Sequence, residues 1–254
     1  MLVVTAELVL VIIALFAVAT LYSSVGLGGG SGYLAVLSMT SFAAAEAIWL
    51  KQYAWSLNLI VAGIAFWHYH KSGYHVKGLS FPFISASVPM AALGGFMLVE
   101  GKLYDFLLTI TLLVAAWRLV STDAGMSEIA RPSVPSALAV GGAIGLASGV
   151  IGIGGGIFLL PALVIGRWAT AKEAAATTAL FVWLNSMAGL VGAGMAGRLE
   201  MEASLLVPFS AAVLLGGMVG SKYGSRVSSQ RGVMAILVLV LLLGASKRVL
   251  EIVG

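Results

Sequence analysis

Long apolar stretches separated by short charged breaks run along almost the whole chain. A helix needs roughly 20 apolar residues to cross the hydrocarbon core of a bilayer, so each stretch of that length predicts a membrane span. Lipid offers no partner to a free backbone N–H or C=O group, and the pattern therefore predicts an all-α integral membrane protein. We expect spans over residues 2–24, 46–67, 79–99, 103–120, 134–151, 173–196, 204–221 and 232–247.

Two glycine clusters interrupt this pattern, and each is followed by an apolar segment that is too short to span. The first cluster, VGLGGG, precedes Tyr33–Met39, and the second, IGIGGG, precedes Ile157–Ile165. Consecutive glycines break a helix because each costs about 1 kcal/mol relative to alanine. A segment of about ten residues covers only part of the hydrocarbon core, so each is predicted to be a half-helix.

The chain contains an internal duplication. The glycine cluster at 25–30 recurs at 151–156, and Glu46 and Asn58 recur as Glu173 and Asn185. Many transporter folds are built from such repeats, and we expect about four full spans and one glycine-broken half-helix in each. The predicted domains are a first transmembrane repeat over 1–120, a polar linker over 121–135 and a second repeat over 136–254.

Loop charge predicts how the two repeats are oriented, because Lys and Arg favour the cytoplasmic side. If each repeat makes four crossings, the basic residues divide almost evenly between the two sides. If each glycine cluster and its half-helix complete a fifth crossing, the division becomes uneven, which favours inverted repeats with both termini outside. One side then holds Lys71, Lys77, Arg118, Arg131, Arg167, Lys172, Lys222, Arg226 and Arg231, and the other holds Lys102, Arg198, Lys247 and Arg248.

Composition narrows the class of protein further. Of 254 residues, 60% are hydrophobic and only 9% are charged, too few charges to give a soluble α/β domain its polar faces. The absence of cysteine excludes disulfides and thiol chemistry. The first basic residue is Lys51, so the apolar N-terminus lacks the positive region of a cleaved signal peptide and is expected to remain a span. The net charge of +4 gives no sign of a nucleic-acid partner.

The glycine clusters are the first candidate binding site. Close helix packing is one interpretation, but packing glycines recur every fourth residue, whereas these are consecutive. A dinucleotide fingerprint would need a preceding strand. A helix that restarts after a break has unpaired N–H groups and a positive dipole end, which together favour an anion. The candidate residues are Gly26, Gly28, Gly29, Gly30 and Ser31 in the first copy and Gly152, Gly154, Gly155 and Gly156 in the second.

Polar residues inside the spans are the second group of candidates. Lys51 is either a snorkelling lysine near the interface or a counter-ion for an anionic substrate, because charges within spans are rare and often functional. Asn58 and Asn185 either bond helix to helix or contact substrate. Neutral hydrogen bonds would come from Gln52, Thr177 and Thr178, and Thr178 is the counterpart of Lys51 in the second copy.

Charged residues near the ends of the spans have alternative interpretations. Glu46 and Glu173 complement the dipoles at helix starts or couple transport to protons. Arg118 and Arg248 are membrane anchors or gates. The run FWHYHKSGYHVKG at 66–78 holds all three histidines, and we interpret it as a basic aromatic loop against lipid headgroups rather than a metal site. No metal or cofactor is expected.

The doubled G-x-GGG followed by a short apolar segment, which continues to LLP in the second copy, resembles the sulfite exporter TauE/SafE family, also called the toluenesulfonate uptake permease group. The resemblance covers essentially the whole chain. It implies a transporter of sulfite, sulfonates, related organosulfur anions or, in some members, carboxylates. The first copy lacks a counterpart of Pro161, and Ile157 stands where the first copy has Ser31, so we do not expect mirror-symmetric substrate contacts.

These observations predict a secondary transporter, an exporter of sulfite or an organosulfonate, in the bacterial inner membrane. The sequence has no G-x-x-x-x-G-K-[ST] motif, so ATP is not the expected driving force. The alternatives are a carboxylate or other small-anion permease driven by protons or sodium, and an anion channel. A membrane enzyme is disfavoured because the acidic residues and histidines fall in loops or at helix ends. Lipid is an expected partner, and a homodimer is left open.

Overall fold

The computed structural model describes residues 6–97, 99–121 and 129–226, and the regular structure of this part is entirely helical. The seven predicted spans that fall there are helices, both half-helices are present, and the eighth predicted span, 232–247, lies outside the described residues. The α-helices are α1 (Ala6–Ser23), α2 (Gly30–Ser38), α3 (Ala47–Lys71), α4 (Lys77–Phe96), α5 (Gly101–Ser121), α6 (Val134–Ile151), α7 (Gly156–Ile165), α8 (Ala171–Met195) and α9 (Ala203–Arg226), with a short 3-10 helix η1 (Ser41–Ala44).

Five of these helices, α1, α4, α6, α8 and α9, are long and apolar enough to cross a membrane. The helix α3 is also of spanning length, since its 25 residues extend over about 37 Å. It carries Lys51, Gln52 and Asn58, and all three are buried inside the protein rather than exposed to lipid. The lower hydropathy of α3 therefore reflects its central position in the bundle.

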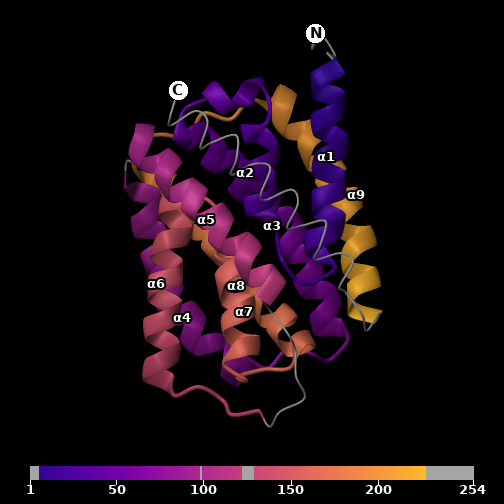
Figure 1. Ribbon diagram of the computed structural model, residues 1–254, viewed down its shortest axis with the longest axis vertical. Coiled ribbons are helices and arrows are strands. Elements are labelled where there is room, and N and C mark those ends of the chain that lie inside the picture. The colour runs from indigo at the N-terminus through magenta and orange to yellow at the C-terminus, as the bar shows by residue number, and fades with distance from the viewer. Residues whose placement is uncertain (1–5, 98, 122–128, 227–254) are drawn as a thin grey trace.

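The half-helix α2 returns the chain to the end at which α1 began. The N–H and hydroxyl groups of Ser41 donate to the carboxylate of Glu7, at 2.6 and 3.0 Å, so the end of α2 lies beside the start of α1. At the other end of the bundle, the Tyr69 hydroxyl donates to the Ser24 carbonyl oxygen at 2.9 Å. The helices α1 and α3 therefore run in the same direction, and α2 runs against them (Figure 1).

The half-helix α7 makes the same return in the second repeat. The N–H of Ala130 donates to the Arg167 carbonyl oxygen at 2.9 Å, which brings the start of α6 beside the end of α7. Lys172 donates to the carbonyl oxygens of Gly224 and Ser225 at the end of α9, at 3.1 and 2.8 Å. The end of α9 lies against the end of α1, so α6 begins at the end of the bundle opposite to the start of α1. The two half-helices accordingly occupy opposite halves of the molecule (Figure 1).

Helices of one sequence repeat pack mainly on helices of the other. The contacts come in matching pairs, in which α1 packs on α9 as α6 packs on α4, and α3 packs on α9 as α8 packs on α4. The helices α3 and α8 pack against each other. Their facing surfaces, together with the two glycine breaks, form the centre of the molecule.

Glycines at every fourth residue allow the closest of these contacts. Each faces a backbone carbonyl group across the interface, and a Cβ atom there would overlap the carbonyl oxygen. Such spacing is typical of helix pairs whose backbones approach closely within a membrane. The contacts are Gly141, Gly145 and Gly149 of α6 on Phe83, Ser87 and Ala91 of α4, and Gly216, Gly220 and Gly224 of α9 on Phe16, Thr20 and Ser24 of the α1 region.

This packing predicts opposite effects for two alanine substitutions in α6. A Cβ at Gly149 would overlap the Ala91 carbonyl, so Gly149→Ala should lower the free energy of unfolding by about 1–3 kcal/mol. A Cβ at Gly142 would meet its nearest neighbours at ordinary distances of 3.7 and 3.8 Å, so Gly142→Ala should raise it by up to about 1 kcal/mol. Thermal unfolding of the purified variants in detergent measures the difference. Equal effects would contradict the packing described.

The two ends of the bundle differ in charge, and we name them accordingly. The acidic end, where α1 and α3 begin, holds Glu7, Glu46, Glu100, Asp105, Glu200, Glu202, Lys102 and Arg198. The basic end, where α3 and α9 finish, holds Lys71, Lys77, Arg131, Arg167, Lys172, Glu173, Lys222 and Arg226.

Candidate functional site

The two glycine breaks meet at the centre of the protein, between α3 and α8. A Cβ at Gly30 would lie 2.7 Å from the Ile153 carbonyl oxygen and from the Asn58 side-chain nitrogen. A Cβ at Gly156 would lie 3.0 Å from Leu27. Each break therefore contacts the other, and only residues without side chains fit at these positions.

Two matched glycines before each half-helix share a left-handed conformation, although the turns differ between them, since Gly154 has a φ of 75° and its counterpart Gly28 is not left-handed. Their N-caps, Gly29 and Gly155, have left-handed φ values of 105° and 80°. Three residues earlier, Gly26 and Gly152 are also left-handed, with φ values of 77° and 94°. Side chains rarely adopt this conformation, which explains the glycines at matched positions. The duplication seen in the sequence is therefore matched in backbone conformation at these two positions of each break.

Asn58 bridges the two repeats at this point. Its Nδ2 atom donates to the Ile153 carbonyl oxygen at 3.4 Å and to the Ser186 hydroxyl at 3.2 Å. Its Oδ1 atom is buried and has no hydrogen-bond partner among the described residues. Its counterpart Asn185, on α8 next to Ser186, is also fully buried, and neither its Nδ2 nor its Oδ1 atom has a partner in the same part of the chain.

Two further buried hydroxyl groups lie at the second break. Thr178 has its methyl group beside the Cβ position of Gly156, and Ser148 approaches that of Gly155. Neither hydroxyl has a hydrogen-bond partner among the residues that the structure describes. Sequence reasoning missed Ser148, although a polar residue one turn before the break was a usable signal. Buried polar groups are almost always hydrogen-bonded, so this concentration of unpaired atoms is unusual.

Lys51 is buried and contacts the second break. Its side chain packs on Gly152, where a Cβ would lie 2.6 Å from the Lys51 Cγ atom, and its ammonium lies 5.6 Å from the centre of the Tyr104 ring. The Tyr104 hydroxyl in turn donates to the Ile151 carbonyl oxygen at 3.2 Å. A snorkelling lysine keeps its head in water, whereas Lys51 is only 1% exposed. It lies at the C-terminal end of α6, where the helix dipole is negative.

Two other predicted site residues have partners elsewhere. The Gln52 side chain donates to the Glu200 carbonyl oxygen at 2.6 Å and accepts from the Glu200 N–H at 2.8 Å, which attaches α3 to the loop before α9. The Ser31 hydroxyl lies 3.1 Å from the Tyr22 hydroxyl, within the first repeat. The structure does not bring these two side chains to the unpaired atoms at the centre.

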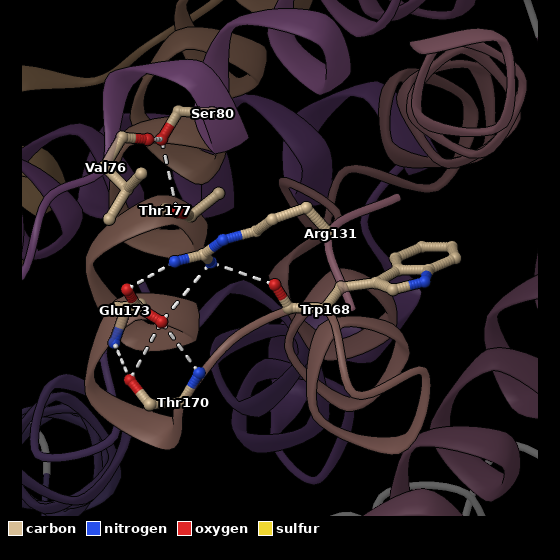
Figure 2. Close-up of polar contacts among 7 residues, drawn as sticks. All are labelled: Val76, Ser80, Arg131, Trp168, Thr170, Glu173 and Thr177. Atoms are coloured by element: carbon tan, nitrogen blue, oxygen red, sulfur yellow. Dashed lines mark hydrogen bonds and ion pairs between the residues drawn. The ribbon is translucent and has the colours of Figure 1, made fainter. Parts of the chain in front are cut away.

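Thr177 belongs to a polar chain between α4 and α8 instead. Its hydroxyl lies 3.1 Å from that of Ser80, which is in turn 3.1 Å from Nε2 of His75 (Figure 2 shows the first of these contacts). Burial, and then the nearby His70 and Lys77, lower the pKa of His75 below its ordinary value of 6.5. The lowered pKa favours the uncharged form of the His75 ring in this chain of contacts.

Glu173 stabilises the start of α8. It forms a capping box with Thr170, in which each side chain bonds to the other residue's N–H group. Its carboxylate also pairs with Arg131 at 2.7 Å, and Arg131 donates to the Trp168 carbonyl oxygen at 2.9 Å. Figure 2 shows the guanidinium group between these two acceptors. The ion pair thus connects the segment before α6 to the turn between α7 and α8.

Glu46 differs from its counterpart Glu173 in its position at the helix start, and this difference predicts unequal contributions to stability. It is the exposed N-cap of α3, without a side-chain capping hydrogen bond. Glu173→Gln should lower the free energy of unfolding by about 1 kcal/mol, because it weakens the capping box and the partly exposed ion pair. Glu46→Gln should change it by less than about 0.5 kcal/mol. Chemical denaturation in detergent measures both, and equal losses would contradict the assignment.

The remaining predicted gating residues are not placed at the site. Arg118 lies in the last turn of α5, but its side chain is outside the described part of the structure. Arg248 also lies outside the described residues. Their proposed roles as anchors or gates stay predictions.

Comparison with known proteins identifies the family of the chain. The family model described as sulfite exporter TauE/SafE matches residues 10–247. The chain is similar to the probable membrane transporter protein y4hK of Sinorhizobium fredii (strain NBRC 101917 / NGR234), with 32% identity over 92% of this chain and 95% of that protein. It is also similar to the probable membrane transporter protein YunE of Bacillus subtilis (strain 168), with 27% identity over 50% of this chain and 46% of that protein.

No solved structure matches the chain. The sequence match extends from α1 through both glycine breaks to residues beyond α9. Together with the several apolar helices of spanning length, it identifies a multi-pass membrane protein. The chain therefore belongs to the sulfite exporter TauE/SafE family of membrane transporters.

Proposed function

We propose that the protein is a secondary transporter that exports a small sulfur oxyanion, sulfite or an organosulfonate, and binds it where the two glycine breaks meet. The observation that carries this proposal is the set of buried polar atoms without partners around the breaks. They belong to Asn58, Ser148, Thr178 and Asn185. A bound oxyanion would accept hydrogen bonds from the Ser148 and Thr178 hydroxyls and from Nδ2 of Asn185, donors that are costly to leave unpaired. The Oδ1 atoms of Asn58 and Asn185 are acceptors, and an anion does not satisfy them.

Backbone electrostatics support an anion at this place. Both α2 and α7 begin at the centre with glycine N-caps that lack a side-chain capping bond. The first N–H groups of a helix have no partner within the helix, and its dipole is positive at that end. Broken helices in other transporters bind anionic substrates in this way. Lys51 would supply a full positive charge close to the second break.

The described conformation corresponds to an occluded state in this proposal. Every residue from Val25 to Ser38 and from Ile151 to Ile157 is buried. The Gln52–Glu200 contacts close the acidic end of the central helices, and the Lys172 contacts with the end of α9 close the basic end. Alternate opening of these contacts would expose the site to one side at a time.

We infer that the repeats are inverted and that the basic end faces the cytoplasm. The start of α1 at the acidic end and the start of α6 at the basic end support the inversion, and the concentration of Lys and Arg supports the orientation. The N-terminus is then outside the inner membrane of a bacterium. When an anion leaves a cell with a negative interior, its free energy falls by about 2.3 kcal/mol per charge per 100 mV. Export therefore needs no coupled ion.

A flux assay in proteoliposomes tests the proposal. Sulfite, thiosulfate, sulfate, sulfoacetate and lactate are compared, with and without a pH gradient. We expect saturable flux with counterflow for sulfite or sulfoacetate. A membrane potential that is negative inside the vesicles should accelerate efflux of the anion. Preferred transport of lactate driven by protons would favour the carboxylate permease instead, and single-channel currents would contradict a carrier.

A further inference from the structure

A basic groove lies at the membrane surface of the basic end, away from the central site. It has a volume of about 630 Å³ and lies between the last turns of α3 and α9. Three of its lining residues, Lys71, Lys222 and Arg226, are cationic. The two helices come from different sequence repeats, so a ligand in the groove contacts both.

The charges in this basic groove favour an anion. No acidic residue is among its lining residues in the described part of the chain. Helix C-termini are negative and would by themselves repel an anion. At the end of α9, however, the ammonium of Lys172 binds the carbonyl oxygens of Gly224 and Ser225, which offsets this effect. The net field in the groove is therefore positive.

The apolar wall of the basic groove indicates that the anion carries a hydrocarbon tail. Trp67, Met218 and Val219 line it and are 56%, 50% and 56% exposed. Along α9, Leu215 and Leu214 are also exposed, at 57% and 42%, and continue the apolar surface to the middle of the helix. A free phosphate or carboxylate gains nothing from such a surface, whereas an acyl chain packs along it.

The position of Trp67 agrees with a membrane interface at this depth. Tryptophan is enriched at the headgroup level, because its ring is apolar and its N–H group is polar. The ammonium of Lys71 lies 5.1 Å from the centre of the Trp67 ring, which holds a cation at the mouth of the groove. The headgroup site and the start of the acyl-chain surface are thus adjacent.

We propose that the basic groove binds an anionic phospholipid of the cytoplasmic leaflet, with the phosphate between α3 and α9 and an acyl chain along the exposed face of α9. Basic pockets between membrane helices on the cytoplasmic side bind such headgroups. The inference depends on the proposed orientation of the protein in the membrane but not on the transported substrate. A wrong substrate would leave the lipid site intact, and a failure of lipid binding would leave the proposed substrate intact.

Lipid binding to the purified full-length protein in a neutral detergent tests this inference. Phosphatidylglycerol and cardiolipin are titrated against phosphatidylcholine, with native mass spectrometry for occupancy and thermal shift for stabilisation. The groove variant is Lys71→Gln with Lys222→Gln, and the matched control is Lys77→Gln with Arg167→Gln, which removes the same charge from the same end outside the groove. We expect affinity for anionic lipid to fall about thirty-fold in the groove variant and to change little in the control.

Three outcomes would overturn the proposal. Equal losses in the groove variant and the control would mean that the whole basic end attracts lipid without a specific site. Displacement of the lipid by inorganic phosphate or glycerol phosphate at similar concentrations would indicate a free-anion site. Unchanged affinity in a groove variant that unfolds at the wild-type temperature without lipid would exclude the groove. The charge-preserving variant Lys71→Arg with Lys222→Arg should retain binding.

Discussion

Substitution of Gly155 by alanine should reduce anion affinity at least tenfold and make transport undetectable at substrate concentrations that saturate the wild type. Gly155 has a φ of 80°, and its Cβ would lie 2.8 Å from Ile144 and 3.0 Å from Phe181. The new methyl group would push the start of α7 away from α6 and α8. The N–H groups proposed to bind the anion would then move, and misplacement by about 1 Å is enough to weaken a preorganised site severely.

Gly197 provides the control for backbone strain. Its φ is 67°, and nothing lies within 4 Å of its Cβ position. Gly197→Ala should carry the same left-handed strain, about 1–2 kcal/mol, without touching the site. Equilibrium binding by calorimetry, with unfolding measured on the same samples, separates the two effects. If both variants lose affinity in proportion to their stability, the breaks have no special role in binding.

Helix positions were predictable from the sequence because lipid imposes a simple length and polarity requirement. The expected span 134–151 coincides with α6, and the half-helices were located by their glycines. The start of α8 was less predictable. It begins at Ala171 rather than at the expected 173, because the capping box between Thr170 and Glu173 makes Thr170 the N-cap and so adds two residues to the helix. The first repeat has no such box at Glu46, and there the chain forms η1 instead.

Side-chain partners within the site were not predictable, because they depend on contacts between residues far apart in the chain. Nothing near Asn58 in the sequence indicates that its amide reaches Ile153 and Ser186 in the other repeat. Lys51 is similar, since it belongs to the first repeat but contacts Gly152 of the second. Residue type identified these as candidates, and only the packing of α3 against α8 assigns their neighbours.

Asn185 and Asn58 should differ sharply when each is replaced by leucine, which has nearly the same shape as asparagine. In Asn58→Leu the hydrogen bonds to Ile153 and Ser186 are lost, and two acceptors are left buried, so the free energy of unfolding should fall by about 1–3 kcal/mol. In Asn185→Leu no hydrogen bond to a described residue is lost. Removal of two unpaired polar atoms should leave stability unchanged or raise it by up to about 2 kcal/mol.

Anion binding should respond in the opposite sense to stability at Asn185. The Asn185 amide is fully buried and has no hydrogen-bond partner among the described residues, and binding of substrate would explain its presence there. Asn185→Leu should therefore lower anion affinity at least tenfold in a protein that is no less stable. Thermal unfolding with and without sulfite or sulfoacetate measures both quantities in one experiment, because a ligand that binds only the folded state raises its stability. A destabilised Asn185→Leu protein with unchanged affinity would show instead that the asparagine bonds helix to helix, and the unpaired atoms would then no longer support a substrate site.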